Sequence, residues 1–194
     1  GPHNIMVGAM GINAAQYGYN TNAGVVDSTG APAGGPPNLS GGTMNYQDRG
    51  VDAQYQYLLN PHTVTAQARY IKENITDNTI PGPAGNLTNK LNSFFAKVSY
   101  VYDATYGAAL GYQNVTGTTD NVAYGSGSTL SNYAMSATNS PNTTAWIPSI
   151  WYQPIQYLRI GLQYTAFTKY MGGTSCYNDT SQGAPCRKAS DNNT

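Results

Sequence analysis

The stretch that decides the fold is VDAQYQYLLNPHTVTAQARY, residues 51–70. Apolar and polar side chains alternate from Val51 to Tyr57, and the alternation resumes after residues 59–62 and continues to Tyr70. An alternation of period two indicates a strand with one apolar and one polar face, and Asn-Pro between two such runs indicates a turn. The stretch therefore predicts an antiparallel hairpin.

Two further hairpins are predicted by the same pattern. Residues 94–100 and 106–113 alternate around a turn at 102–104, and residues 158–168 alternate after a turn at 153–156. The strand before that turn, residues 144–152, is less regular, because Ile147 and Trp151 lie on the face opposite to Trp146, Ile150 and Tyr152. Pro148 lies in this last hairpin and cannot donate a backbone hydrogen bond, so we expect a β-bulge there. Residues 4–17 read as one more strand, although the pattern does not decide its facing. The chain thus predicts seven strands.

The links between these strands are of two kinds that alternate along the chain. Three are tight turns, and the others are long segments rich in Gly, Asn, Ser, Thr and Pro, at about residues 18–44, 74–90, 115–142 and 168–194. Strict alternation places the two kinds at opposite ends of the strands. Short periplasmic turns and long extracellular loops are typical of outer-membrane proteins. We therefore expect an all-β fold, an antiparallel up-and-down transmembrane β-barrel, with residues 1–194 as a single segment of it.

The odd strand count carries an expectation of its own. Bacterial single-chain barrels have even numbers of strands, because an open sheet edge is not tolerated in lipid. We expect the natural polypeptide to begin before Gly1 and to continue past Thr194, so that the segment is truncated at both ends.

The composition is consistent with this fold. Charged residues make up only 9% of the chain, against about 25% in an average soluble domain. Disorder is disfavoured because aromatic residues make up 11% of the chain. No apolar run approaches the ~20 residues that a membrane helix requires, and a net charge of zero gives no indication of a nucleic-acid partner.

Charged residues in the clear strands all share the polar face. An Arg or Lys on the lipid face near mid-membrane costs about 2–4 kcal/mol, so this segregation is what a membrane barrel needs. A soluble sandwich predicts the same alternation, but not the low charge content. The candidates for residues that face the lumen are Asp52, Gln54, Gln67, Arg69, Lys97, Arg159 and Gln163. Three bases and one acid would bias a pore weakly toward anions; alternatively, these residues fill a closed barrel with ion pairs and hydrogen bonds.

Aromatic residues gather near both ends of the predicted strands. One group lies beside the tight turns, and comprises Tyr57, Tyr100, Tyr102, Tyr106, Tyr152 and Tyr157. The other lies toward the long links, and comprises Tyr46, Tyr70, Tyr112, Trp146, Tyr164 and Phe167. Two such bands are expected at the two membrane–water interfaces.

The remaining chemistry is sparse. Cys176 and Cys186 enclose nine residues of a polar link, which favours a disulfide in an oxidising compartment over two free thiols. The sequence contains no Cys-x-x-Cys-His haem site, no phosphate loop and no His-Glu-x-x-His pair, and His3 and His62 are far apart. We therefore predict no catalytic site, no metal site and no cofactor, and do not expect an enzyme.

The third hairpin also resembles a known group of proteins. TTAWIPSIWYQPIQYLRIGLQYTAFTKYMGG, residues 143–173, followed by ASDNNT, residues 189–194, resembles the penultimate hairpin of porin-like outer-membrane proteins, in particular barrels associated with c-type cytochromes. The resemblance covers about the last third of the chain. It implies an insulating sheath around an electron conduit, with a multihaem c-type cytochrome as partner. Without a haem-attachment motif, the chain itself would carry no covalent haem.

Three functions remain open from the sequence. The first is a porin-like channel or scaffold for passive passage of small solutes, in the bacterial outer membrane, with outer-membrane lipid as its surroundings and a homo-oligomer as one assembly. The second is the barrel sheath of a porin–cytochrome electron conduit. The third is a cell-surface structural or adhesive β-protein, which would be soluble without detergent.

Overall fold

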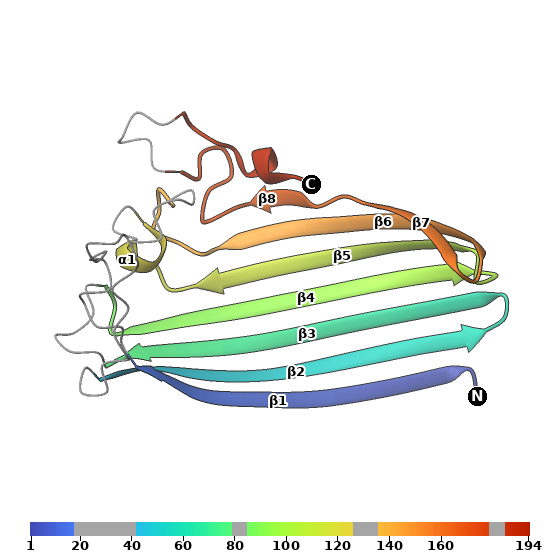
Figure 1. The fold of residues 1–194 in the computed structure, drawn as a ribbon, viewed down its shortest axis with the longest axis horizontal. Helices are drawn as coiled ribbons and strands as arrows, with labels where there is room; N and C mark the ends of the chain where they lie inside the picture. The colour runs from blue at the N-terminus through green and yellow to red at the C-terminus, as the bar shows by residue number, and fades with distance from the viewer. Residues whose placement is uncertain (18–41, 79–84, 126–135, 179–184) are drawn as a thin grey trace, which may run out of the picture.

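The computed structural model describes residues 1–17, 42–78, 85–125, 136–178 and 185–194, and these form one antiparallel sheet with short appendages (Figure 1). The strands are β1 His3–Tyr17, β2 Thr43–Leu59, β3 His62–Asp77, β4 Thr88–Tyr102, β5 Tyr106–Gly117, β6 Thr143–Ile155, β7 Leu158–Gln163 and β8 Ala166–Lys169. They pair in chain order from β1 to β7, and β8 also pairs with β6. The expected antiparallel meander is therefore confirmed. The sheet is open, with β1 at one edge and β7 and β8 at the other.

Tight turns and long links lie at opposite ends of the strands, as the sequence predicted (Figure 1). We call these the turn end and the long-link end. The described parts of the long links include a short helix, α1 Asn121–Tyr124, and a 3-10 helix, η1 Ala189–Asn192. Much of the expected loops 18–44, 74–90, 115–142 and 168–194 lies outside the described residues.

The strands reach further toward the long-link end than the alternation indicated. β3 runs to Asp77 and β4 begins at Thr88, so the link between them is shorter than residues 74–90. Between Val51 or Tyr70 and the long-link end, the positions that continue the apolar face are occupied by Arg, Lys, Gln and Asn, so neither face is uniformly apolar there. The period-two signal therefore fades before the strand ends.

The last predicted strand, residues 158–168, is interrupted opposite Pro148. The amide of Tyr164 donates to the Pro148 carbonyl at 3.0 Å, but Pro148 has no N–H with which to complete the pair. The missing bond separates β7 from β8, while the register stays the same on both sides, from Ser149↔Gln163 to Trp146↔Ala166. The expectation of a bulge at Pro148 is wrong. The register shifts lie instead between Tyr152 and Ile155, and between Thr144 and Ala145.

The pairing register gives the sheet two chemically distinct faces, because directly opposed residues share a face. The apolar face carries rows such as Val51, Tyr70 and Phe94, while the polar face carries rows such as Asp52, Arg69 and Phe95. The apolar face is the more exposed of the two. Val98 and Leu110 are 53% and 51% exposed on it, whereas Ala109, on the polar face between β4 and β6, is only 9% exposed.

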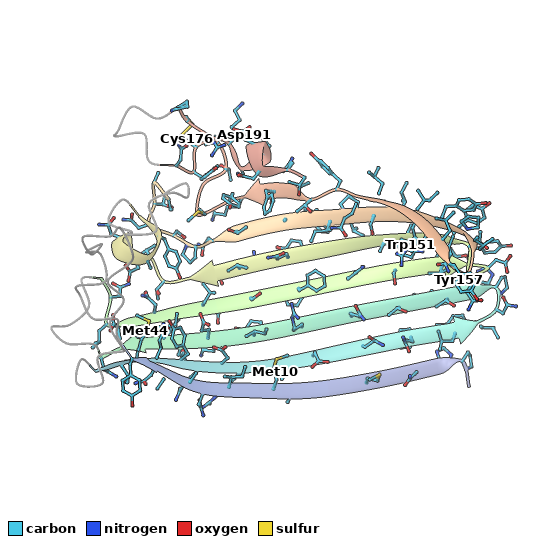
Figure 2. All side chains as sticks on the ribbon, in the orientation of Figure 1. Met10, Met44, Trp151, Tyr157, Cys176 and Asp191 are labelled. Carbon is cyan, nitrogen blue, oxygen red and sulfur yellow. A yellow bond between two sulfur atoms is a disulfide. The ribbon has the colours of Figure 1, made fainter. Side chains whose placement is uncertain are left out.

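The hydrophobic core is correspondingly small. Among the described residues the buried hydrophobic side chains are Ala109, Ala145, Tyr177 and Ala189. Two of these belong to the C-terminal segment beyond β8, where Cys176 and Asp191 are seen in Figure 2. The predicted disulfide is confirmed: Cys176 and Cys186 are bonded, with their Cα atoms 5.3 Å apart.

Candidate functional site: the polar face of the sheet

Five of the seven predicted lumen residues lie together on β2, β3 and β4. Asp52 is directly opposite Arg69, and Gln67 lies between Gln54 on one side and Lys97 on the other. The Gln67 side-chain amide donates to the Gln54 side-chain oxygen at 2.6 Å. This central cluster is held by three adjacent strands.

Small and aromatic neighbours shape the central cluster. A Cβ atom at Gly8 would lie 2.5 Å from the Asp52 carboxylate, so glycine leaves space for this side chain above β1. The Arg69 guanidinium lies 6.0 Å from the centre of the Phe95 ring, within the range of a cation–π contact. A shallow groove of about 290 Å³ is lined by side chains that include Met10, Asp52, Gln54, Gln67, Arg69 and Phe95. The groove presents a carboxylate, a guanidinium and two side-chain amides.

The other two predicted residues lie on β7, Arg159 at the turn end and Gln163 four residues further along the strand. Arg159 on β7 lies with its guanidinium 4.3 Å from the centre of the Trp151 ring, close enough for a cation–π interaction. Gly107 makes this arrangement possible, because a Cβ atom there would overlap the Trp151 indole. Gln163 lies on the same face, opposite Ser149. Figure 2 shows Trp151 at the turn end of the sheet.

Three acids that the sequence reasoning missed occupy the polar face toward the long-link end. Asp48 and Glu73 are directly opposite one another, and Asp77 follows on the same face of β3. Asp48 Oδ1 is buried without a hydrogen-bond partner among the described residues. The sequence already indicated the face of Asp48, because residues four apart on one strand, such as Asp48 and Asp52, point to the same side of the sheet. Only the fading apolar alternation hid the fact that the strands continue.

The link that carries α1 lies close to these acids. Burial, and after it the negative charges of Glu73 and Asp120, raises the pKa of the Tyr124 phenol above its ordinary value of 10.0. Asp120 in turn accepts hydrogen bonds from the Asn86 amide at 2.9 Å and from the Asn89 side chain at 2.8 Å. This part of the link is therefore hydrogen-bonded to the link and strand that follow β3. It adds a phenol and a carboxylate to Asp48, Glu73 and Asp77, which we call the acidic region.

The charge balance of the polar face changes accordingly. The strands place four acids on it, Asp48, Asp52, Glu73 and Asp77. The bases on it are Arg69, Lys97 and Arg159. The count of one acid and three bases, from which a weak bias toward anions was expected, is therefore incomplete for this face. Its charge runs from acidic at the long-link end to basic at the turn end.

The apolar face carries most of the predicted aromatic residues. At the turn end, His3 Nδ1 is 2.7 Å from the Tyr55 hydroxyl, and His62 Nδ1 is 2.8 Å from the Tyr100 hydroxyl. Toward the long-link end, Tyr112 contacts Trp146 with 4.8 Å between ring centres. Each histidine is thus an exposed residue that also contacts a tyrosine hydroxyl.

Two members of the predicted bands are misplaced. Tyr46 is opposite Ile75, and Phe167 is opposite Ala145, which places both on the polar face. The Tyr46 hydroxyl donates to the Met44 sulfur at 2.9 Å, and Phe167 contacts Tyr170 edge to face. The aromatic bands were predicted from how far each residue lies along its strand. The face of the sheet depends instead on whether the residue is at an odd or an even position, and this separates Tyr46 and Phe167 from the other members.

The segregation of charge holds only within the apolar band. Arg49, Lys72 and Lys90 lie on the apolar face beyond Val51 and Tyr70, and all three are exposed. The segregation expected for the clear strands therefore does not extend to the part of β2, β3 and β4 nearest the long links.

No protein-family model, curated protein or solved structure matches this chain. Within the described ranges, no three or more His, Cys, Asp or Glu side chains are placed to share a metal ion. Of the helices the structure describes, none has the length and apolar character to cross a membrane.

Proposed function

We propose that this chain forms part of the wall of a porin-like outer-membrane β-barrel, with its polar face toward an aqueous lumen and its apolar face toward lipid. The observation that carries the proposal is the inverted exposure of the two faces. In a soluble sheet protein the apolar face is covered and the polar face is open. Here Val98, Leu110 and Ile150 are 53%, 51% and 60% exposed, while the side chains on the polar face of β4, β5 and β6 are half-buried or buried.

The height of the apolar band supports a membrane-spanning role. On β2 the band runs from Val51 to Tyr57, and on β3 from Val64 to Tyr70. Seven residues at about 3.3 Å each extend about 23 Å along a strand, and on β4 the band has nine residues, from Phe94 to Tyr102, or about 30 Å. At the usual strand tilt of about 35–45° these lengths correspond to heights of about 16–25 Å, against an apolar band about 25 Å tall in outer-membrane barrels. Both strands continue past the band toward the long-link end, so the wall would extend beyond the membrane on that side.

A groove on the apolar face is also suited to lipid. It has a volume of about 520 Å³ and is lined at the turn end by side chains that include Tyr100, Tyr106, Ile150 and Ile160. Four tyrosines, Tyr100, Tyr102, Tyr106 and Tyr152, are among its lining residues, as expected where acyl chains meet headgroups. A soluble protein of this design would expose a large contiguous apolar surface to water, which monomeric soluble proteins rarely do.

Closure is a further requirement of the proposal. The outer edges of β1 and β7 would leave unpaired backbone groups in lipid, which costs several kcal/mol per group. Further strands of the same polypeptide or neighbouring copies would have to pair with them. The total strand number sets the lumen width: about eight strands leave room mainly for side chains, and about sixteen or more open a channel.

The experiment is conductance of the purified natural protein in planar bilayers, combined with the heat-modifiable gel shift of folded barrels. A channel lined by the acidic region should favour cations, and replacing Asp48, Glu73 and Asp77 with Asn, Gln and Asn should move the reversal potential toward anions. Asp103→Asn removes one negative charge at the β4–β5 turn instead of on the polar face, and is the control for each single substitution of the set. A protein that stays soluble without detergent and shows no gel shift would instead support the structural or adhesive alternative.

The electron-conduit sheath stays a prediction from the resemblance. Haem absorbance in the purified barrel, or co-purification with a multihaem cytochrome, would favour it. A haem-free protein that conducts ions would favour the porin-like function.

A further inference from the structure

A group of three cations lies on the apolar face just beyond the apolar band, and we call Arg49, Lys72 and Lys90 the basic row. Arg49 on β2 is directly opposite Lys72 on β3, and Lys72 is opposite Asn92, two residues from Lys90 on β4. All three side chains are exposed. The basic row therefore spans three adjacent strands, with Lys90 two residues further toward the long-link end than Arg49 and Lys72.

The sheet itself offers the basic row no countercharge. The acids of β2, β3 and β4 are Asp48, Asp52, Glu73 and Asp77, and the register places all of them on the polar face. Arg49 and Lys72 nevertheless face each other directly, and like charges directly opposed in a sheet are destabilising. An anion supplied from outside the strands would relieve this repulsion.

Directly below the basic row the surface becomes aromatic and aliphatic. Val51, Tyr70 and Phe94 form the next row of the same face, two residues or about 7 Å along the strands. The Tyr70 hydroxyl donates to Asn92 Oδ1 at 3.0 Å, so its ring lies in the apolar band and its polar end reaches the height of the basic row. A ligand that fits both rows has an anionic group and an apolar portion a few ångströms apart.

We propose that the basic row binds the phosphate groups of lipid headgroups at the long-link side of the membrane, while the acyl chains cover the apolar band below. This inference rests on the proposed function, because it needs the apolar face to lie in lipid. Arg and Lys supply the donors that phosphate oxygens accept. A soluble polyanion such as a nucleic acid would match the cations but not the adjoining apolar row.

The test compares two triple variants of the natural protein purified in neutral detergent. The first is Arg49→Gln, Lys72→Gln and Lys90→Gln, which neutralises the basic row. The second is Arg69→Gln, Lys97→Gln and Arg159→Gln, which removes the same charge from the polar face. Native mass spectrometry measures the affinity of each for phosphatidylglycerol, phosphatidylcholine and inorganic phosphate, at low and at 0.15 M salt.

We expect wild type to prefer phosphatidylglycerol and to lose about fivefold in that preference for each cation removed, the factor equivalent to ~1 kcal/mol per Lys or Arg near an anionic surface. The basic-row triple would then lose up to about a hundredfold, and the polar-face triple would keep the wild-type value. The exchange variant Arg49→Lys, Lys72→Arg and Lys90→Arg keeps the charge and should keep the preference.

Three results would overturn the inference. Equal losses in both triples would show an effect of net charge alone. No loss in the basic-row triple would show that these cations do not bind lipid. Equal binding of inorganic phosphate, with no preference among lipids, would assign the row to a soluble ligand. Failure of the proposed function looks different, since wild type would then enter neither micelles nor vesicles of any composition.

Discussion

A single arginine on the apolar face provides the sharpest test of the proposed orientation. Val98 lies midway along the apolar band of β4, between Ala66 on β3 and Leu110 on β5, and is 53% exposed. If this position faces the bilayer centre, Val98→Arg should destabilise the folded protein by about 2–4 kcal/mol. Since a factor of ten corresponds to about 1.36 kcal/mol, the folding equilibrium in vesicles should fall by about 30- to 900-fold.

Two matched arginine variants separate depth from facing. Ser99→Arg places the same side chain at the next residue on the polar face. Thr116→Arg places it on the apolar-face side of β5, at the height of Asn92 and therefore beyond the band. We expect each to cost about 1 kcal/mol or less, because lumen and interfacial positions remain hydrated. The protein is refolded into neutral vesicles and titrated with denaturant, with the gel shift as the readout of folding.

The pattern across the three variants decides the outcome. Equal effects of Val98→Arg and Ser99→Arg would refute a lipid-facing assignment of the apolar face. A large effect of Val98→Arg in a protein that folds in water without detergent would mean that the face is a covered core. Only a large loss at Val98, small losses at Ser99 and Thr116, and a requirement for lipid or detergent agree with the proposal.

Three other predictions concern single features. Cys176→Ser with Cys186→Ser should weaken the C-terminal segment by about 2–3 kcal/mol, the chain-entropy value for a loop of about ten residues, and limited proteolysis should cut there sooner than in wild type. Tyr124 should ionise only above pH 10, because its pKa is raised; the stability that its neutral form contributes is present below about pH 10 and lost as pH rises through the higher folded-state value. Absorbance titration of Tyr124→Phe should lack this late phenolate, and an unchanged titration would contradict the assignment. Gly107→Ala should displace the Trp151 indole and shift tryptophan emission, while an unaltered spectrum would show that the ring does not lie over Gly107.

The sequence predicted the sheet well where one face is apolar and the other polar. From Val51 to Tyr57 and from Val64 to Tyr70 each residue's parity gives its face, and the register follows from the hairpin turn. For the same reason the central cluster of Asp52 and Arg69 could be predicted. The split at Tyr164 could be anticipated only in part, since Pro148 shows that a hydrogen bond is missing but not whether the strands respond with a bulge or a gap.

The acidic region and the basic row could not be read from the alternation, because both lie where it ends. Residues 44–50 and 71–77 mix charges with Ile, Gly and Asn on both faces. Only the continuous register shows that Asp48 and Glu73 share one face and Arg49 and Lys72 the other. Strand prediction from alternation depends on a difference in polarity between the two faces, and this difference disappears where both faces carry polar side chains.

The same four residues bear on how the register between β2 and β3 is fixed. In the observed register Asp48 faces Glu73 and Arg49 faces Lys72, so both pairs repel. A slip of one residue could bring Asp48 opposite Lys72, which would attract, but it would also turn the Val64–Tyr70 side chains of β3 toward the polar face. In the proposed orientation, burial of these apolar side chains in lipid outweighs the charge pairing within the two strands. An anion bound to the basic row would remove one of the two repulsions. We therefore expect anionic lipid to strengthen the observed register as well as to bind to its surface.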